Sequence, residues 1–319
     1  MRKYFRPAIF SFVLAAVFLS FGCSKDRKLY QGMEDMFREK KLEMARLKDN
    51  LAAETAAEAD GRTPERSASD FETLGDSYLK RGELALAFLN YTKAAGLEPE
   101  NPVIKYKIGR LLLKKGSPEE AGIEFEEIIK QGKKPLLGYE GLGRVFFRTG
   151  DLARAKENFE GALKLDPSHW QARNFLGMLH DRRGEYGEAV RYYESAMAGA
   201  PEEPVLFNNL GVSLYRSGDH TRAAGMFERA LELRPEPKVY NNLALTLARL
   251  QRYPEALEIF TAASNEWTAL NNLGLVYLAQ GKYREAEEAF SRAAEKSPRY
   301  FEKAIENLEK ARTRGRRAA

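Results

Sequence analysis

Asparagine pairs recur along this chain at nearly regular intervals, and their chemistry suits a binding surface. The pairs are Asn208-Asn209, Asn241-Asn242 and Asn271-Asn272, and Asn174 stands alone at the corresponding place upstream. A carboxamide offers two hydrogen-bond donors and an acceptor, so a row of them can hold an extended peptide by its backbone. Basic residues recur with similar spacing and would attract an acidic partner; they are Arg148, Arg182, Arg216 and Arg249.

Residue types that usually catalyse do not form a recognisable motif. The sequence has no phosphate-binding loop, no HExxH and a single cysteine. Among its three histidines, His169 and His220 fall in predicted turns and His180 at a predicted core position. The sequence therefore predicts a non-catalytic protein with no cofactor and no metal site. An enzyme would need carboxylates from separate helices to converge in a groove, and that alternative stays open.

The charge of the chain is modest once its first residues are set aside. The formal net charge is +5, with 51 basic and 46 acidic residues among 319. Arg2, Lys3 and Arg6 lie in the first 22 residues, and removing them leaves 48 basic residues against 46 acidic ones. A nucleic-acid-binding protein needs a concentrated basic face. The only dense basic run is 312–317, expected to be a solvated tail, so no nucleic-acid partner is predicted.

The amino terminus has the three parts of an export signal. A basic head precedes an apolar stretch over residues 8–22, too short for a membrane-spanning helix. Cys23, the only cysteine, follows at once and resembles the lipidated cysteine of a bacterial lipobox. That resemblance implies a signal peptide over 1–22 and a lipid anchor at Cys23, and Ser24 then indicates the outer membrane. A cleaved signal without lipid and an uncleaved anchor are the alternatives.

Landmarks recur in the rest of the chain with a period close to 34 residues. Gly75, Gly109, Gly143, Gly177 and Gly211 keep that period, and Ala244 and Gly274 follow at slightly shorter steps. Seven positions after each of these comes another glycine, except at Gln251. Twelve positions after is always alanine, and sixteen after is always aromatic: Tyr91, Phe125, Phe159, Tyr193, Phe227, Phe260 and Phe290.

The period describes a pair of helices repeated along an axis. In the first helix the central glycine shares one face with large apolar residues. A glycine inside a helix costs about 1 kcal/mol relative to alanine, so we expect a closely approaching helix to compensate. The second glycine ends the first helix in a left-handed conformation. Alanine and the aromatic residue share one face of the second helix, which a proline usually ends.

This pattern resembles the tetratricopeptide repeat over residues 68–300, in seven consecutive units. The resemblance implies an all-α, right-handed superhelical solenoid whose first helices line a concave groove that binds peptides. It also implies that the asparagine and arginine rows face that groove. In the family, an asparagine and a later base are common even where no ligand binds, so a purely structural role stays open. The sixth unit is shortened before Trp267, which predicts a local change of pitch.

Two segments flank the predicted array. Residues 301–319 are expected to form a capping helix and the basic tail. Residues 23–67 are expected to hold the lipidated cysteine, a helical spacer near 27–52 and a flexible tether from 53. The apolar residues of the spacer, from Met33 to Leu51, lie near a heptad pattern. The spacer could therefore lie on the first repeat or pair two copies, and the oligomeric state is not determined.

The function expected from these features is protein binding at the cell envelope. The chain resembles lipid-anchored tetratricopeptide proteins that assist pilus and secretion-system assembly. This implies a scaffold on the periplasmic face of the outer membrane that binds a partner segment in its groove. The alternative is a structural or coordinating factor in cell-wall or outer-membrane biogenesis.

Overall fold

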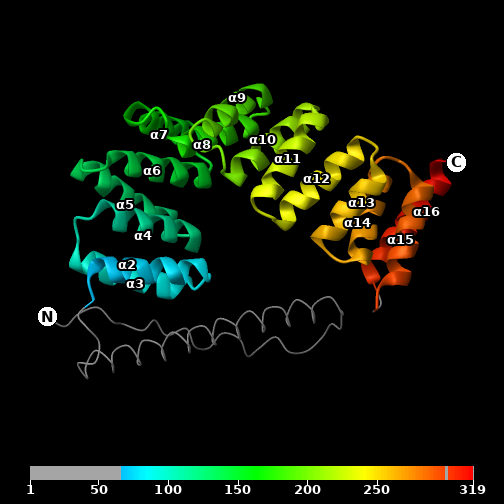
Figure 1. The fold of residues 1–319 in the computed structure, drawn as a ribbon, viewed down its shortest axis with the longest axis horizontal. Helices are drawn as coiled ribbons and strands as arrows, with labels where there is room; N and C mark the ends of the chain where they lie inside the picture. Colours follow the sequence, from blue (N-terminus) through cyan, green and yellow to red (C-terminus); the bar gives the residue numbers. More distant parts are fainter. Residues whose placement is uncertain (1–65, 299–300, 319) are drawn as a thin grey trace, which may run out of the picture.

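A computed structural model describes residues 66–298 and 301–318, and this part of the chain folds into fifteen α-helices without a strand (Figure 1). Seven first helices alternate with seven second helices. The first helices are α2 (Ala68–Lys80), α4 (Pro102–Lys115), α6 (Pro135–Thr149), α8 (Trp170–Arg182), α10 (Pro204–Ser217), α12 (Pro237–Arg249) and α14 (Glu266–Ala279). The second helices are α3 (Leu84–Leu97), α5 (Pro118–Gln131), α7 (Leu152–Leu165), α9 (Tyr186–Met197), α11 (His220–Leu233), α13 (Tyr253–Ala263) and α15 (Tyr283–Lys296). The last helix is α16 (Glu302–Ala318). The all-α solenoid of seven hairpins with a capping helix is confirmed.

The turn inside each hairpin uses the left-handed backbone that the recurring glycines predict. Gly218, for example, ends α10 with a φ of 94° and donates its N–H to the last turn of that helix. Gln251 occupies the equivalent place after α12 and adopts the same conformation, with a φ of 63°. Residues other than glycine rarely adopt this left-handed backbone conformation. The sixth repeat therefore keeps the turn geometry without the residue that favours it.

The core of each hairpin is an aromatic ring packed on the central glycine of the first helix. The alanines and aromatic residues singled out in the sequence are all buried. A methyl group built on Gly211 would lie 2.7 Å from Cε1 of Phe227, and one on Gly109 would lie 2.6 Å from Cζ of Phe125. The aromatic ring of the second helix thus contacts the backbone of the first helix at the central glycine, where no side chain intervenes. The close approach expected from the mid-helix glycines is confirmed, and an aromatic ring makes the contact.

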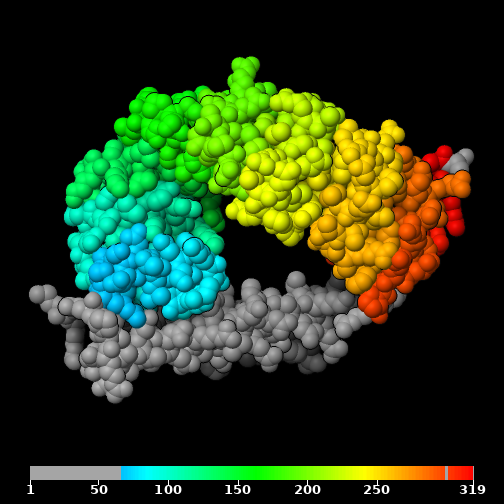
Figure 2. Space-filling model, in the orientation of Figure 1, coloured from blue at the N-terminus to red at the C-terminus, as the bar shows by residue number. Residues whose placement is uncertain are grey.

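The repeats follow an arch, with the first repeat at one end and α16 near the other (Figures 1 and 2). Successive first helices pack on one another from α4 through α12, whereas no two second helices do so to that degree. Elements on the inner side of a curved array lie closer together than those on its outer side. The first helices therefore line the concave surface, as the family resemblance implies.

The carboxyl-terminal end differs from expectation in one respect. Helix α16 covers the last repeat, with Ala304 and Ala311 buried against it. It continues to Ala318, so the basic run at 312–317 is helical rather than a tail. Gly315 lies against Tyr283, and Nε of Arg312 is 3.4 Å from Oε2 of Glu287, which holds this last part on α15.

Several expectations concern residues outside the described range. These are the signal peptide at 1–22, the lipidated Cys23, the spacer near 27–52 and most of the tether from 53. Within 66–298 and 301–318, no helix is both long and apolar enough to cross a membrane.

Candidate peptide-binding surface

Four of the predicted asparagines bind one another on the concave surface. Nδ2 of Asn209 donates to Oδ1 of Asn174 at 2.9 Å, and Nδ2 of Asn242 donates to Oδ1 of Asn208 at 3.1 Å. Within the pair, Asn208 donates to Asn209 at 3.2 Å. These bonds run from α8 through α10 to α12. Some donors and acceptors of these asparagines are therefore occupied by hydrogen bonds that join neighbouring repeats.

The chain of asparagine bonds stops between the sixth and seventh repeats. In each of the bonds that join two repeats the later helix donates to the earlier one, and the bond that Asn272 would donate to Asn241 is missing from the described part of the chain. Beyond this break, Nδ2 of Asn307 in the capping helix donates to Oδ1 of Asn271 at 3.1 Å. Asn241 and Asn272 have no side-chain hydrogen bond within the described residues. These two half-buried amides are thus the predicted asparagines with donors and acceptors available to a ligand.

The predicted basic row also takes part in contacts between repeats. Arg148 donates to the carbonyl oxygen of Leu113 in the last turn of α4, and Arg182 donates to that of Phe147 at the end of α6, at 3.2 Å. Carbonyls in the last turn of a helix lack partners inside the helix. The bases therefore satisfy the ends of the preceding first helices. Arg216 is exposed.

A residue that the sequence prediction overlooked divides the concave surface into two halves. It is the position directly after each central glycine or alanine. In the first three repeats it is charged: Asp76, Arg110 and Arg144. In the last four it is apolar: Met178, Val212, Leu245 and Leu275. The signal is present in the sequence as the type of residue that follows each central glycine or alanine.

The charged half neutralises itself through ion pairs between repeats. Nζ of Lys107 lies 2.6 Å from Oε1 of Glu72 and 2.7 Å from Oδ2 of Asp76. Asp76 also accepts a bond of 2.7 Å from the hydroxyl of Tyr91, a buried aromatic residue of the first hairpin. The acids of this half are therefore occupied by bases and hydroxyls of the protein.

Glu140 is a buried acid on α6, the last first helix of this charged half, and is only 2% exposed. The hydroxyl of Tyr106 and Nε of Arg144 both approach Oε1, at 2.8 and 2.7 Å, and Nε2 of His169 lies 3.1 Å from Oε2. Burial alone would raise the pKa of Glu140. The bond from His169, the charge of Arg144 and the bond from Tyr106 outweigh burial and lower the pKa to about 2. This carboxylate links α4, α6 and the start of α8.

The three histidines have neighbours inside the repeats. His169 precedes α8 and contacts Glu140, and His220 begins α11 with its ring 5.0 Å from that of Tyr215. His180, expected in the core, is half-buried; its Nδ1 lies 2.5 Å from Glu185 and its ring stacks on Tyr192.

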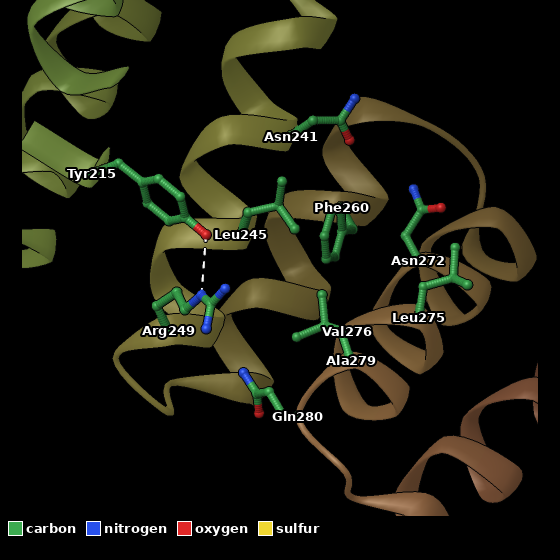
Figure 3. Close-up of a pocket in the computed structure, with 10 residues that line it drawn as sticks. All are labelled: Tyr215, Asn241, Leu245, Arg249, Phe260, Asn272, Leu275, Val276, Ala279 and Gln280. Atoms are coloured by element: carbon green, nitrogen blue, oxygen red, sulfur yellow. Dashed lines mark hydrogen bonds between the residues drawn. The ribbon is translucent and has the colours of Figure 1, made fainter. Parts of the chain in front are cut away.

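A pocket of about 360 Å³ opens between α12 and α14, where the asparagine bonds stop. Figure 3 shows Phe260 between the two helices, with Leu245 on one side and Leu275 on the other. These leucines are 40% and 42% exposed. The lining residues are Tyr215, Asn241, Leu245, Arg249, Phe260, Asn272, Leu275, Val276, Ala279 and Gln280.

The polar groups of this pocket are Asn241, Asn272, Arg249, Tyr215 and Gln280. Nε of Arg249 donates to the hydroxyl of Tyr215 at 3.1 Å (Figure 3). Gln280 is used within the protein, because its amide donates to the carbonyl of Ala248 and accepts from Tyr253. The pocket thus combines an apolar centre, two available amides and one oriented cation.

The shortened sixth repeat accompanies this opening. Its second helix, α13, has 11 residues, against 14 in α11 and in α15. Asn265 then caps α14 directly by accepting from the N–H of Thr268. The departure of the sixth repeat from the regular period therefore coincides with the gap between its first helix and the next.

Comparison with known proteins identifies the family. Models of the tetratricopeptide repeat match residues 72–134, 141–204, 208–266 and 267–300. None of the curated proteins matches the chain. Proteins of this family act as protein-interaction scaffolds that bind protein or peptide partners, and their fold is typically non-catalytic.

Solved structures agree on the fold. A chain of the APC/C hetero-tetramer Cut9–Hcn1 is 23% identical, with a TM-score of 0.56 over 80% of this chain and 50% of that one. This chain therefore spans about half the length of that protein. The C-terminal part of a repeat protein from Cytophaga hutchinsonii is 18% identical, with a TM-score of 0.52 over 73% of this chain and 98% of that one. Since the family models match more than half of the chain, the protein belongs to the tetratricopeptide repeat family.

Proposed function

We propose that this protein is a scaffold, anchored by a lipid on Cys23 to the periplasmic face of the outer membrane, which holds a segment of a partner protein in its concave groove. The observation that carries the binding role is the pocket between α12 and α14. There, exposed leucines and unbonded amides face one space. Soluble proteins seldom leave large apolar side chains and free amides together unless a ligand covers them.

The anchor rests on the sequence. The apolar stretch at 8–22 and the single cysteine directly after it fit a lipidated signal. Cys23→Ser should abolish uptake of labelled fatty acid and release the protein from membranes or leave it as precursor. Ser24→Asp should keep the lipid but shift the protein to the inner membrane. The anchor is wrong if the wild type takes up no label and Cys23→Ser fractionates like it.

The binding role can be tested by photo-crosslinking in the cell envelope. A photoreactive amino acid would replace Arg216 or Leu245, which are exposed on the concave surface. The matched control is Ile123, which is 64% exposed on a second helix. We expect the two concave positions to capture the same partner and the control to capture none. Capture from Ile123 alone would place binding on the outer surface and refute the proposal.

The identity of the captured partner decides between envelope pathways. A pilus or secretion-channel component would support the assembly role that the resemblance implies. A cell-wall or outer-membrane biogenesis protein would support the alternative of a coordinating factor.

A further inference from the structure

We infer that the pocket between α12 and α14 binds an extended peptide that carries a large apolar side chain and, close to it, an acidic residue. This inference rests on the proposed function and specifies the chemistry of the partner segment. It follows from the apolar centre of the pocket, from its two available amides and from its single cation.

The apolar centre of the pocket determines which type of peptide side chain can bind there. Five large apolar side chains are exposed in the described part of the chain, and two of them, Leu245 and Leu275, line this pocket. Val276, Ala279 and the ring of Phe260 complete an apolar lining. A side chain inserted between the leucines would remove both from water, which favours leucine, isoleucine, methionine or phenylalanine in the ligand.

The free amides select an extended backbone. Asn241 and Asn272 stand on neighbouring first helices that the pocket separates, so these helices are further apart than the roughly 8–10 Å of directly packed helices. An extended chain advances about 3.3 Å per residue, so the two amides can meet backbone groups that are about three or more residues apart. A helical ligand satisfies its own backbone groups and would leave both amides unused.

The charge of the pocket selects the accompanying residue. Arg249 is the only charged residue in its lining, and no acid lines it. The bond from its Nε to Tyr215 orients the guanidinium, and its terminal amino groups have no ion pair within the described residues. Arg216, on the adjacent first helix, is exposed and also has no ion pair there. A carboxylate beside Arg249 would accept paired hydrogen bonds from a planar cation.

The test is selection of short random peptides, displayed on phage, against the full-length protein in detergent. We expect the selected peptides to share a large apolar residue with Asp or Glu close to it in the sequence. A selected peptide, synthesised with a fluorescent label, should bind Leu275→Asp about tenfold or more weakly than wild type, because truncating a central anchor has effects of that size. Ile123→Asp should bind like wild type.

A double-mutant cycle tests the acidic residue. Arg249→Gln should weaken binding of the acidic peptide severalfold, and a peptide with Asn in place of its acid should bind wild type and Arg249→Gln equally. Binding that is unchanged in Leu275→Asp, or selected peptides without an acid or with helical apolar spacing, would overturn the inference. It would also be overturned if peptides bind only after residues 24–65 are removed, because the chain itself would then fill the pocket.

These outcomes differ from failure of the proposed function. Crosslinking of a partner from Arg216 and Leu245, together with unchanged peptide binding in Leu275→Asp, would refute the inference alone. Absence of any crosslink from the concave positions would refute the scaffold role itself.

Discussion

Two glycine-to-alanine substitutions in the fifth repeat should change stability in opposite directions. Gly211 lies inside α10 and Gly225 lies inside α11, so alanine gains about 1 kcal/mol of helix propensity at either place. A methyl group on Gly225 would meet no atom within 4 Å. We therefore expect Gly225→Ala to stabilise the protein by about 1 kcal/mol.

The same methyl group on Gly211 meets the ring of Phe227. It would lie 2.7 Å from Cε1 and 2.9 Å from Cδ1, whereas carbon atoms pack best about 3.5–4.0 Å apart. The ring is almost fully buried, so it must shift by roughly 1 Å within a filled core. Overpacking of this kind costs about 1–3 kcal/mol. After the propensity gain, we expect Gly211→Ala to be destabilised by up to about 2 kcal/mol.

Urea melts followed by far-ultraviolet circular dichroism measure both variants. Repeat arrays can unfold in segments, but both residues lie in one hairpin and share one segment, which makes the comparison direct. The difference between the two variants should be about 1–3 kcal/mol, the cost of overpacking alone. If the two alanines had the same effect, the contact between glycine and ring would not be what selects glycine.

The sixth repeat offers an internal comparison for this argument. Ala244 stands there in place of glycine, opposite Phe260, and that ring borders the pocket rather than a filled core on every side. Ala244→Gly should therefore lower the free energy of unfolding by about 1 kcal/mol, which is the difference in helix propensity alone.

Three further sites, two of them with a matched control, should show distinct effects on stability. Gln251→Gly should stabilise by about 1 kcal/mol in urea melts, because it relieves a left-handed glutamine, and Gly218→Gln should destabilise by a similar amount. The pKa of Glu140 is lowered to about 2 from 4.5. Its carboxylate therefore contributes fully to the free energy of unfolding above pH 4.5, and this contribution is lost as the pH falls towards 2. Glu140→Gln should lower the free energy of unfolding by about 3 kcal/mol at neutral pH. In urea melts, the difference in stability between wild type and this variant should shrink below pH 4.5. A difference that does not change with pH would contradict the lowered pKa of Glu140. Asn242→Ala should cost about 0.5–1.5 kcal/mol by removing its bond to Asn208, whereas the neighbouring Asn241→Ala should stay within about 0.5 kcal/mol.

The sequence by itself determines the hairpin. The contacts that define it join residues about sixteen positions apart, such as Gly211 and Phe227, so one short segment contains both partners. The turn is equally local, because a glycine at a fixed offset favours the left-handed backbone. Seven repetitions of these local rules leave little choice of fold, and the periodicity of the sequence was therefore sufficient to predict it.

The tertiary structure alone decides which of the recurring polar residues can bind a ligand. Asn241 and Asn242 are adjacent and identical in type, yet one bonds to the preceding repeat and the other lines a pocket. Neither residue type nor spacing distinguishes them, because the outcome depends on how far α12 stands from α10 and from α14. Those separations follow from the curvature of the whole array and from the short α13. Contacts between repeats join residues from separate hairpins, so their geometry exists only once the hairpins have stacked.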